Sequence, residues 1–314
     1  PAHDDAHIGF VTAVDRGRYT VLLDENGINE RPVITMKARE LGRDRVVCGD
    51  RVAVVGDVSG AKDTLARIVR IEERRSVLRR TADDTDPYER IVVANADQLV
   101  IVVALADPPP RTGMIDRAVV AAYDAGMDVL LCLTKADLGS ADDLRALYEP
   151  VGVNVVVTSM FDAETVTAVK THLTGRVSVF FGHSGVGKST LVNALVPDAK
   201  RAVGHVNDVT GRGRHTSTSA VALRLPGNDG WVIDTPGVRS LGLAHVNIDH
   251  VLAAFDDLAA VADDCPRGCT HLATAPDCAL DSWLADAPDE LTRATRETRL
   301  TSLRRLLASR ADTV

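Results

Sequence analysis

Residues 176–195 read RVSVFFGHSGVGKSTLVNAL, and this stretch decides the fold. An apolar run at 176–181 predicts a buried strand, a glycine-rich loop follows it, and 188–195 has the apolar spacing of a helix. The loop fits G-x4-G-K-[ST], whose glycines let backbone N–H groups wrap a polyphosphate at a helix amino end. The stretch therefore predicts an α/β domain that binds a nucleoside triphosphate. The residues expected to form the site are Gly182, His183, Ser184, Gly185, Val186, Gly187, Lys188, Ser189 and Thr190.

Two side chains of this loop have distinct expected roles. Lys188 should reach the β- and γ-phosphates during catalysis, and Ser189 should ligate Mg²⁺. Farther along, the apolar run at 230–234 predicts a strand that ends in Asp234, within the motif DTPG at 234–237. The Asp234 carboxylate can hold magnesium through water, and the N–H of Gly237 can meet a γ-phosphate. DTPG alone also fits a plain turn, but the phosphate loop before it favours the functional interpretation.

A candidate base-reading motif lies upstream of the phosphate loop. The apolar run at 128–133 ends in TKAD at 134–137, which is similar to the guanine-reading pattern [NT]-K-x-D. A carboxylate at Asp137 can accept from N1–H and the exocyclic amine of guanine, whereas adenine has no such pair of donors. Lys135 would lie along the base plane, and Thr134 is assigned to the same nucleotide site. An ATPase remains the alternative if Asp137 does not read the base.

The position of this motif changes the expected order of the domain. A predicted parallel strand ends at TKAD, at the sheet edge where α/β proteins form ligand sites. The next predicted strand ends in Thr158-Ser159-Met160, which resembles the place where GTPases contact the guanine carbonyl through a backbone N–H. Ser159 is the residue of that loop assigned to the base. No lysine follows Lys200, so the usual position after DTPG is empty. Base loop, phosphate loop and magnesium loop in this order are typical of a circularly permuted GTPase.

Composition changes along the chain indicate separate domains. Short β-rich runs at 9–14, 19–24, 31–38, 51–55 and 66–71 favour a small barrel or sandwich. An arginine-rich stretch and the polar segment 81–90 follow, which places a boundary at residue 80. From residue 91, apolar runs alternate with helical stretches, as in a mostly parallel sheet covered on both faces. Beyond residue 244 the chain is acidic and alanine-rich, and it closes with a basic helix at 291–307.

Five segments together are similar to one known family. They lie at 94–110, 133–138, 182–195, 211–220 and 234–243, and they resemble segments of the bacterial small-ribosomal-subunit-dependent GTPase A family, RsgA or YjeQ. The resemblance implies a multidomain protein with an OB-fold RNA-binding barrel at 1–80, a permuted P-loop GTPase domain at 81–244 and a small helical zinc-binding domain at 245–314. It also implies a GTPase that yields GDP and phosphate, with Mg²⁺ and one structural Zn²⁺.

The polar, glycine-rich segment 207–218 is interpreted as a switch loop. The resemblance implies that Thr216, Ser217 or Thr218 ligates magnesium, with Thr216 the first choice. No glutamine follows Gly237 to orient the attacking water, so His215 is the candidate for that role. A phosphate or RNA contact is the alternative for His215. Slow intrinsic turnover and stimulation by a partner are therefore expected.

Three cysteines and a histidine crowd near the carboxyl end at Cys265, Cys269, His271 and Cys278. Three thiolates and one imidazole suit a closed, tetrahedral structural zinc site. Compared with the family, one residue fewer separates the first two cysteines and one more precedes the last. Spare reduced thiols are the alternative interpretation. Cys48 and Cys132 are expected to be small core residues.

Charge and composition limit the cellular setting. The formal net charge is −8, and the five cysteines are an odd number, which favours a reducing compartment. No signal peptide is recognised, and no apolar run approaches the ~18 residues of a membrane helix, so a cytoplasmic protein without membrane contact is expected. Nothing suggests an obligate dimer, and a monomer is expected. Local basic surfaces can still bind phosphates on an acidic protein.

Three arginine-rich regions suggest an RNA partner. They are residues 67–80, the predicted switch loop, and the last helix, whose leucines Leu300, Leu303 and Leu307 should pack inward while its arginines face out. The resemblance implies that the RNA is that of the small (30S) ribosomal subunit. The leading hypothesis is a late assembly factor that binds this subunit with GTP and leaves after stimulated hydrolysis. The alternatives are a nucleotide-gated RNA-binding module and a permuted GTPase of large-subunit assembly.

Overall fold

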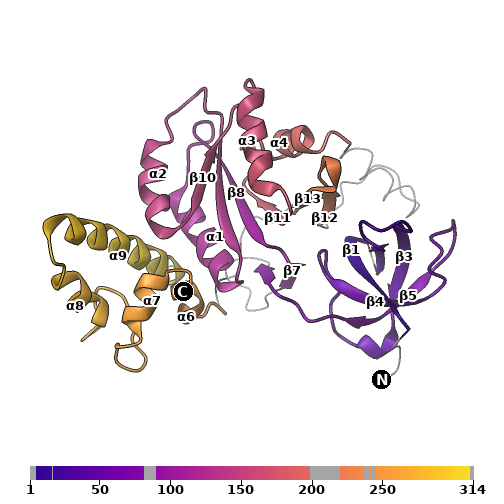
Figure 1. Cartoon of the computed structure of the whole chain (residues 1–314), viewed down its shortest axis with the longest axis horizontal. Coiled ribbons are helices and arrows are strands. Elements are labelled where there is room, and N and C mark those ends of the chain that lie inside the picture. The colour runs from indigo at the N-terminus through magenta and orange to yellow at the C-terminus, as the bar shows by residue number, and fades with distance from the viewer. Residues whose placement is uncertain are drawn as a thin grey trace.

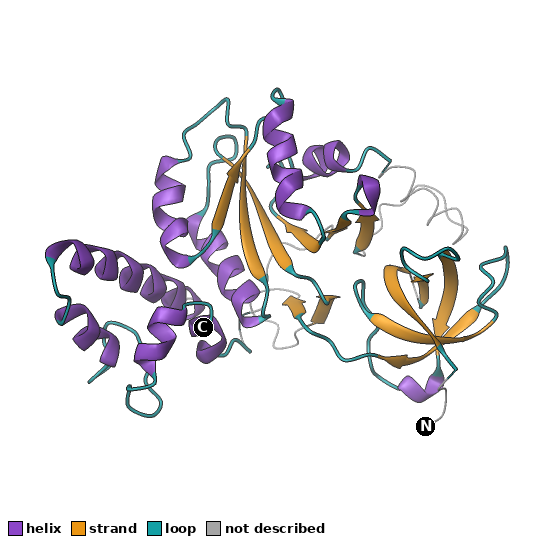
Figure 2. Cartoon of the chain, in the orientation of Figure 1, coloured by secondary structure: helices purple, strands orange, loops and turns teal. Residues whose placement is uncertain are grey.

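The computed structural model describes residues 5–15, 17–80, 90–198, 220–235, 241, 243 and 245–311, with side chains through residue 309. Three parts follow one another along the long axis of the molecule (Figure 1). A β-barrel lies at one end, an α/β domain in the middle and a helical part at the other end, as the colouring by secondary structure in Figure 2 also shows. Within the described ranges, no helix is both long and apolar enough to cross a bilayer.

The amino-terminal part is a closed five-stranded barrel of OB type. Antiparallel pairs join β1 to β2, β2 to β3, β4 to β5 and β1 to β4, and a parallel pair joins β3 to β5. Alternate side chains such as Val11, Val21, Val33, Val52 and Ile68 fill the interior. All five β-rich runs of the sequence are therefore confirmed as strands. Their bounds are β1 (His7–Asp15), β2 (Arg18–Leu23), β3 (Arg31–Lys37), β4 (Arg51–Gly56) and β5 (Ala66–Ile71), with a 3-10 turn η1 (Arg39–Leu41).

The middle part is a doubly covered sheet in the order β10-β9-β8-β11-β13-β12. All neighbours are parallel except β12, which runs antiparallel to β13. Every residue of β8 is buried, because its side chains alternate between two cores: Leu99 and Ile101 pack with α1, and Val100 and Val102 with α3 and α4. The bounds are β8 (Gln98–Ala104), β9 (Asp128–Thr134), β10 (Asn154–Val157), β11 (Arg176–Phe181), β12 (Val221–Arg224), β13 (Gly230–Asp234), α1 (Thr112–Asp124), α2 (Asp142–Tyr148), α3 (Ala163–Leu173), α4 (Lys188–Leu195), η2 (Glu149–Val151) and η3 (Pro226–Asn228).

A small two-stranded sheet lies between the barrel and the α/β domain. Its strands are β6 (Val77–Arg80) and β7 (Arg90–Ala94), which pair antiparallel. After β7, the buried amide of Asn95 donates to the Gly49 carbonyl of the barrel, and its side-chain oxygen accepts from the Arg75 N–H. Arg75 also pairs with Asp97 at 3.2 Å. These bonds tie the connection to both neighbouring parts, and sequence periodicity did not predict this pairing.

Four helices form the carboxyl-terminal part. They are α6 (Ile248–Leu252), α7 (Asp256–Ala262), α8 (Ala279–Ala285) and α9 (Glu290–Ala311). Leu300, Leu303 and Leu307 of α9 are buried, which confirms the predicted inward face of the last helix.

The prediction that the arginines of this helix face outward is wrong for four of them. Arg299 pairs with Asp257 at 2.5 Å, and Arg305 pairs with Asp116 of α1 at 3.2 Å while covering the Tyr148 ring. Arg296 lies over Trp283 and Arg304 pairs with Asp281. The helix packs against α1 on one side and α8 on the other, so these four arginines meet protein partners rather than water alone. Arg293 is exposed, and the side chain of Arg310 lies outside the described residues.

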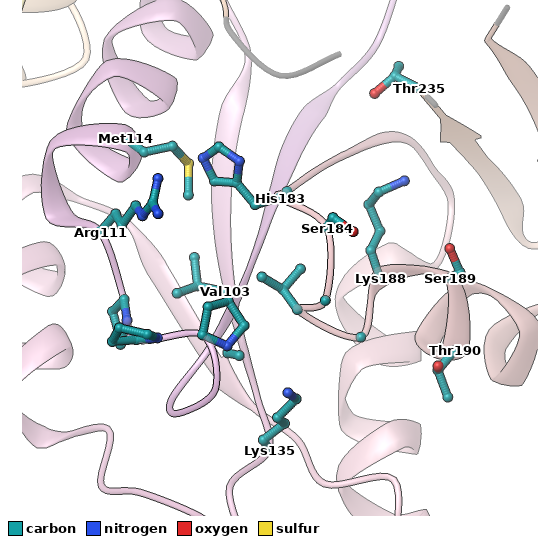
Figure 3. Close-up of a pocket in the computed structure, with 18 of the residues that line it drawn as sticks. Val103, Arg111, Met114, Lys135, His183, Ser184, Lys188, Ser189, Thr190 and Thr235 are labelled. Carbon is teal, nitrogen blue, oxygen red and sulfur yellow. The ribbon is translucent and has the colours of Figure 1, made fainter. Parts of the chain in front are cut away.

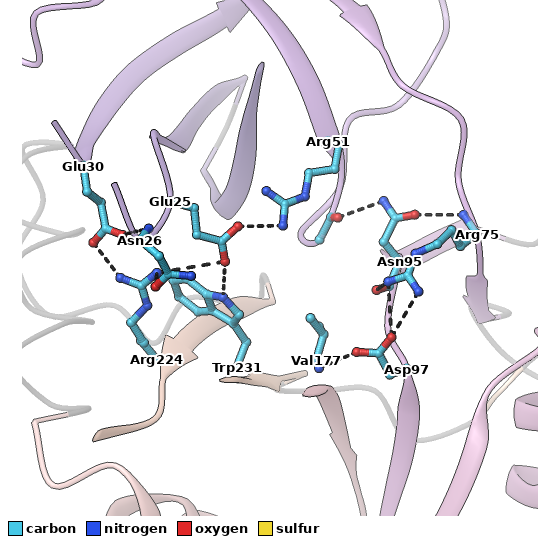
Figure 4. Close-up of polar contacts among 11 residues, drawn as sticks. Glu25, Asn26, Glu30, Arg51, Arg75, Asn95, Asp97, Val177, Arg224 and Trp231 are labelled. Carbon is cyan, nitrogen blue, oxygen red and sulfur yellow. Dashed lines mark hydrogen bonds and ion pairs between the residues drawn. The ribbon is translucent and has the colours of Figure 1, made fainter. Parts of the chain in front are cut away.

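The barrel docks on the antiparallel edge of the central sheet (Figure 4). Ala13 of β1 pairs with Val221 of β12, which joins barrel and sheet through the backbone. Arg224 of β12 pairs with Glu30 of the barrel at 2.5 Å and lies over the Trp231 ring. Its hydrogen bond holds the pKa of Glu30 below the ordinary value.

A second carboxylate completes this junction. Glu25 accepts from the Trp231 indole N–H at 2.7 Å and pairs with Arg51 at 2.6 Å. The Trp231 ring packs against Phe10 of the barrel at a centroid distance of 5.1 Å. Apolar packing and paired charges therefore fix the barrel to β12 and β13 together.

Charge reversal tests this docking. Arg224→Glu places like charges together at a half-buried junction, at a cost of about 1–3 kcal/mol, and we expect the barrel to separate from the sheet. Glu30→Arg should do the same, and the double exchange should restore the contact. Small-angle X-ray scattering would show a larger radius of gyration for each single variant only.

The control is Arg145→Glu, which reverses one charge of the exposed Arg145–Glu149 pair in α2 and its neighbouring turn. This variant should scatter like the wild type. An identical radius of gyration for all four variants would contradict the docking role of Arg224 and Glu30.

Candidate nucleotide and metal sites

The predicted phosphate loop joins β11 to α4 and encloses one end of a cavity of about 950 Å³ (Figure 3). Gly185 and Gly187 have φ values of 86° and 88°, which side chains rarely adopt. A Cβ at Gly182 would lie 2.6 Å from the Val102 carbonyl oxygen. The glycines are therefore required by the loop itself. All nine residues predicted for this site line the cavity: Gly182, His183, Ser184, Gly185, Val186, Gly187, Lys188, Ser189 and Thr190.

Lys188 and Asp234 meet inside this cavity. The Lys188 ammonium pairs with the Asp234 carboxylate, and the two side chains are 14% and 27% exposed. Asp234 ends β13 beside β11, as the sequence predicts, and the next residue, Thr235, donates to the Phe180 carbonyl at 2.9 Å. The Ser189 hydroxyl lines the same cavity. A carboxylate and a hydroxyl beside a phosphate loop are oxygen donors that suit Mg²⁺.

Thr134 connects the candidate base loop to the phosphate loop. It is buried, and its hydroxyl donates to the Val186 carbonyl at 2.6 Å. The next residue, Lys135, has a φ of 56° and donates from its ammonium to the Asp107 carbonyl. Thr134 therefore holds the backbone of the phosphate loop from outside the cavity, whereas the Lys135 side chain lines the cavity itself.

The two candidate base loops also meet each other. The Ser159 hydroxyl donates to Asp137 Oδ1 at 2.9 Å, which orients the carboxylate that would read guanine. The Ser159 backbone N–H already donates to the Thr165 hydroxyl at 3.0 Å. The Thr158 N–H donates to the Leu133 carbonyl at 2.8 Å, so the backbone N–H groups of Thr158 and Ser159 both have partners within the protein. The sequence predicted this loop, but it did not predict that the Ser159 hydroxyl binds Asp137 while the Ser159 backbone N–H binds Thr165.

Several predicted residues lie outside the described part of the chain. They are His215 and Thr216 of the predicted switch loop, its alternatives Ser217 and Thr218, and Gly237 of the magnesium loop.

The structure adds one segment that sequence reasoning missed. Residues 108–111, between β8 and α1, and Met114, in the first turn of α1, line the cavity opposite the phosphate loop. Their signal in the sequence was the run of three prolines directly after a buried strand, at the sheet edge where α/β ligand sites form.

The four predicted metal ligands come together in the helical part. The candidate ligand atoms of Cys265, Cys269, His271 and Cys278 lie within 4.8 Å of one another. Cys265 Sγ lies 3.6 Å from His271 Nδ1 and 3.9 Å from Cys278 Sγ. A tetrahedral zinc with Zn–S near 2.3 Å and Zn–N near 2.0 Å separates its ligand atoms by about 3.5–3.8 Å. The altered spacing in the sequence is therefore compatible with zinc.

The surroundings of this cluster favour a bound cation. Burial lowers the pKa of His271, so the imidazole is neutral and able to ligate. Burial also raises the pKa of the Cys278 thiol to about 11, so this residue becomes a thiolate ligand only when a bound cation lowers that pKa. Backbone N–H groups of Ala279 and His271 donate to Cys265 and Cys269, as they would to thiolates. Cys48 and Cys132 are buried elsewhere, and burial raises both thiol pKa values, which confirms them as core residues.

Comparison with known proteins gives consistent matches. A model of the RsgA GTPase family matches residues 71–244. A protein of Chlorobaculum parvum, named small ribosomal subunit biogenesis GTPase RsgA, is 33% identical over 281 residues, covering 87% of this chain and 90% of its own length. A relative of the same name from Pseudomonas aeruginosa strain LESB58 is 38% identical over 275 residues, covering 85% and 77%.

Two solved structures share the fold. YjeQ from Thermotoga maritima superposes with a TM-score of 0.62 at 25% identity, covering 96% of this chain and 98% of its own. YloQ, described as a circularly permuted GTPase, gives a TM-score of 0.63 at 23% identity, with 97% of each chain covered.

Asp137→Asn tests base recognition. We expect GTP affinity to fall about 10- to 100-fold, because charge-assisted hydrogen bonds to N1–H and the amine are lost. Affinity for xanthosine triphosphate should rise, since an asparagine amide can donate to its extra carbonyl. Equilibrium titration with fluorescent nucleotides measures both. Asp143→Asn on exposed α2 is the matched control, and unchanged GTP affinity in the Asp137 variant would contradict the assignment.

Metal analysis tests the cysteine cluster. Wild-type protein should contain about one zinc per chain, and Cys278→Ser should lose most of it, because a closed site needs all four ligands. Chelation should also lower the melting temperature of the wild type, since structural zinc contributes folding free energy. Cys48→Ala, outside the cluster, should keep its zinc. A zinc-free protein with its terminal helices intact by circular dichroism would contradict the site.

Proposed function

Because the chain belongs to the RsgA GTPase family, we propose that it hydrolyses GTP as a late assembly factor of the small ribosomal subunit. In this function it binds the subunit with GTP and leaves after hydrolysis. The observation that carries the proposal is the convergence of TKAD, the phosphate loop and Asp234 at one sheet edge in permuted order. The names of the relatives, small ribosomal subunit biogenesis GTPases, support the choice of subunit.

The base loops, the phosphate loop and the end of β13 each bind a different part of the nucleotide in this function. Asp137, oriented by Ser159, reads guanine, and Lys135 lies along the base. Lys188 exchanges its ion pair with Asp234 for the β- and γ-phosphates. Ser189 and Asp234 are then free to hold Mg²⁺, which neutralises charge on the phosphate oxygens when bound. GTP binding therefore replaces one internal ion pair with contacts to the ligand.

The remaining roles in hydrolysis are assigned to residues outside the described part. We assign Thr216 to magnesium, the Gly237 N–H to the γ-phosphate and His215 to positioning the attacking water. Their support is their place in the chain, directly before β12 and directly after β13. Because the barrel is fixed to these two strands, a partner on the barrel could influence both loops.

Zinc in the cysteine cluster would have a structural role. Four protein ligands leave no open position, so zinc there would hold the loop between α7 and α8 rather than act on substrate. Arg304 donates to the His271 carbonyl at 3.1 Å and so links the cluster to α9. The three-part division at residues 80 and 244 belongs to this proposal, with the zinc unit as the third part.

Basic residues near the barrel support an RNA partner. A cavity of about 690 Å³ lies between the barrel and β7, and it is lined by Arg43, Arg45, Arg74 and Arg90 together with Asp44 and Glu72. Arg74 is held by buried Asp50 at 2.7 Å and by the Arg45 carbonyl. The exposed guanidinium groups of Arg43, Arg45 and Arg90 suit phosphate oxygens of structured RNA. We propose ribosomal RNA of the small subunit as the ligand of this face, and a monomeric, cytoplasmic protein as the working form.

Steady-state hydrolysis with isolated ribosomal subunits tests the proposal. We expect slow GTP turnover alone and at least about ten-fold stimulation by the small subunit, because the partner orders the catalytic loop. ATP and the large subunit should give little change. Lys188→Ala should abolish the stimulated rate. Equal stimulation by both subunits or by neither would contradict the assigned partner, and equal subunit affinity with GTP, with GDP and without nucleotide would indicate a passive RNA binder.

A further inference from the structure

Arg111 projects into the nucleotide cavity from the side opposite the phosphate loop (Figure 3). It precedes α1 and is exposed, and Met114 one turn later lines the same wall. Neither the base loops nor the phosphate loop contributes it, so the roles already proposed leave it unassigned.

Arg111 differs from the two lysines that line the cavity. Lys135 donates to the Asp107 carbonyl and Lys188 pairs with Asp234. Among the described residues, no hydrogen bond or ion pair joins the Arg111 guanidinium to another group. Most arginines of the barrel junction and of α9 are paired within the protein. A positive charge that has no partner among the described residues therefore lines the cavity where a triphosphate would lie.

The backbone beneath Arg111 is held firmly. Residues 108–110 are prolines, whose rings fix φ, and the Arg111 carbonyl accepts from the N–H groups of Met114 and Ile115 at 3.1 and 3.2 Å. Ile115 is completely buried, and Asp116 beside it pairs with Arg305 of α9. The backbone at Arg111 is therefore constrained before a ligand binds, which limits the backbone entropy that binding would cost.

The positive charge of Arg111 is also unfavourable at its position, the amino end of α1. A helix amino end carries partial positive charge, which favours acidic rather than basic residues in its first turn. The first turn of α1 contains no acidic residue, and no side chain caps it. Arginine and helix end therefore add positive potential at the same wall of the cavity, and an anion bound there would relieve their repulsion.

We propose that Arg111 contacts the γ-phosphate and β–γ bridging oxygens of bound GTP and stabilises the transition state of hydrolysis from within the same chain. This inference rests on the proposed nucleotide site. Water attacks the γ-phosphorus, the bond to the β–γ bridging oxygen breaks, and its electron pair passes to GDP. The water proton leaves with inorganic phosphate. Arg111 stays protonated throughout and offsets charge that develops on the bridging and γ-oxygens.

Two substitutions separate charge from geometry. Arg111→Ala removes the cation, and Arg111→Lys keeps the charge but loses the planar pair of donors. Arg293→Ala is the matched control, because Arg293 is an exposed arginine on α9 far along the chain from the cavity. For each protein, single-turnover GTP hydrolysis without ribosomes and GDP affinity with and without aluminium fluoride, which imitates the transferred phosphoryl group, would be measured.

We expect Arg111→Ala to lose at least about ten-fold in single-turnover rate, with GDP affinity within a factor of about two of the wild type. The gain in GDP affinity from aluminium fluoride should disappear in this variant. Arg111→Lys should be intermediate, and Arg293→Ala should match the wild type in every assay.

Two results would overturn the inference. One is an unchanged hydrolysis rate and an unchanged fluoride effect in Arg111→Ala. The other is an unchanged intrinsic rate with weaker binding to the small subunit, which would assign Arg111 to the partner instead. Failure of the proposed nucleotide site is distinguishable, because the wild type would then neither bind GDP nor hydrolyse GTP. Failure of the assigned ribosomal partner would leave both activities of the wild type intact.

Discussion

The buried hydrogen bond from Thr134 to the Val186 carbonyl joins the two loops on which nucleotide recognition depends. It is 2.6 Å long and connects the end of β9 to the middle of the phosphate loop, which follows β11 of the same sheet. A residue that recognises the base must lie at a fixed distance from the phosphate loop, because one nucleotide would contact both. In this chain the base loop precedes the phosphate loop in sequence, and the strand order β9-β8-β11 together with this bond brings the two loops together.

The rest of the molecule is arranged around the sheet that carries these loops. The barrel is docked on β12 and β13, and β13 delivers Asp234 to the cavity. On the other side, α9 is fixed to α1 through Arg305 and Asp116, and α1 begins at the cavity wall. Both outer parts therefore contact elements that begin or end at the cavity wall, α1 in one case and β13 in the other.

Most secondary structure could be predicted because its signals are local. Alternating apolar residues marked the barrel strands, and continuous apolar runs marked the buried parallel strands. The pairing of β6 with β7 was missed because both strands are short and carry arginines. The outward face predicted for the arginines of α9 was wrong because helical periodicity does not reveal that a second protein surface covers the polar side.

The sequence by itself determined the phosphate loop, the base motif, the permuted order and the four candidate metal ligands. Each of these is a short pattern in which fixed spacing and residue type carry the chemistry. Only the tertiary structure decided which side chains from distant segments contact one another at the site. It paired Ser159 with Asp137, gave Thr134 to the phosphate loop, and aimed Arg111 at the cavity. The physical reason is that hydrogen bonds and burial depend on which strand ends are neighbours in the sheet, and chain order in a permuted domain does not specify that.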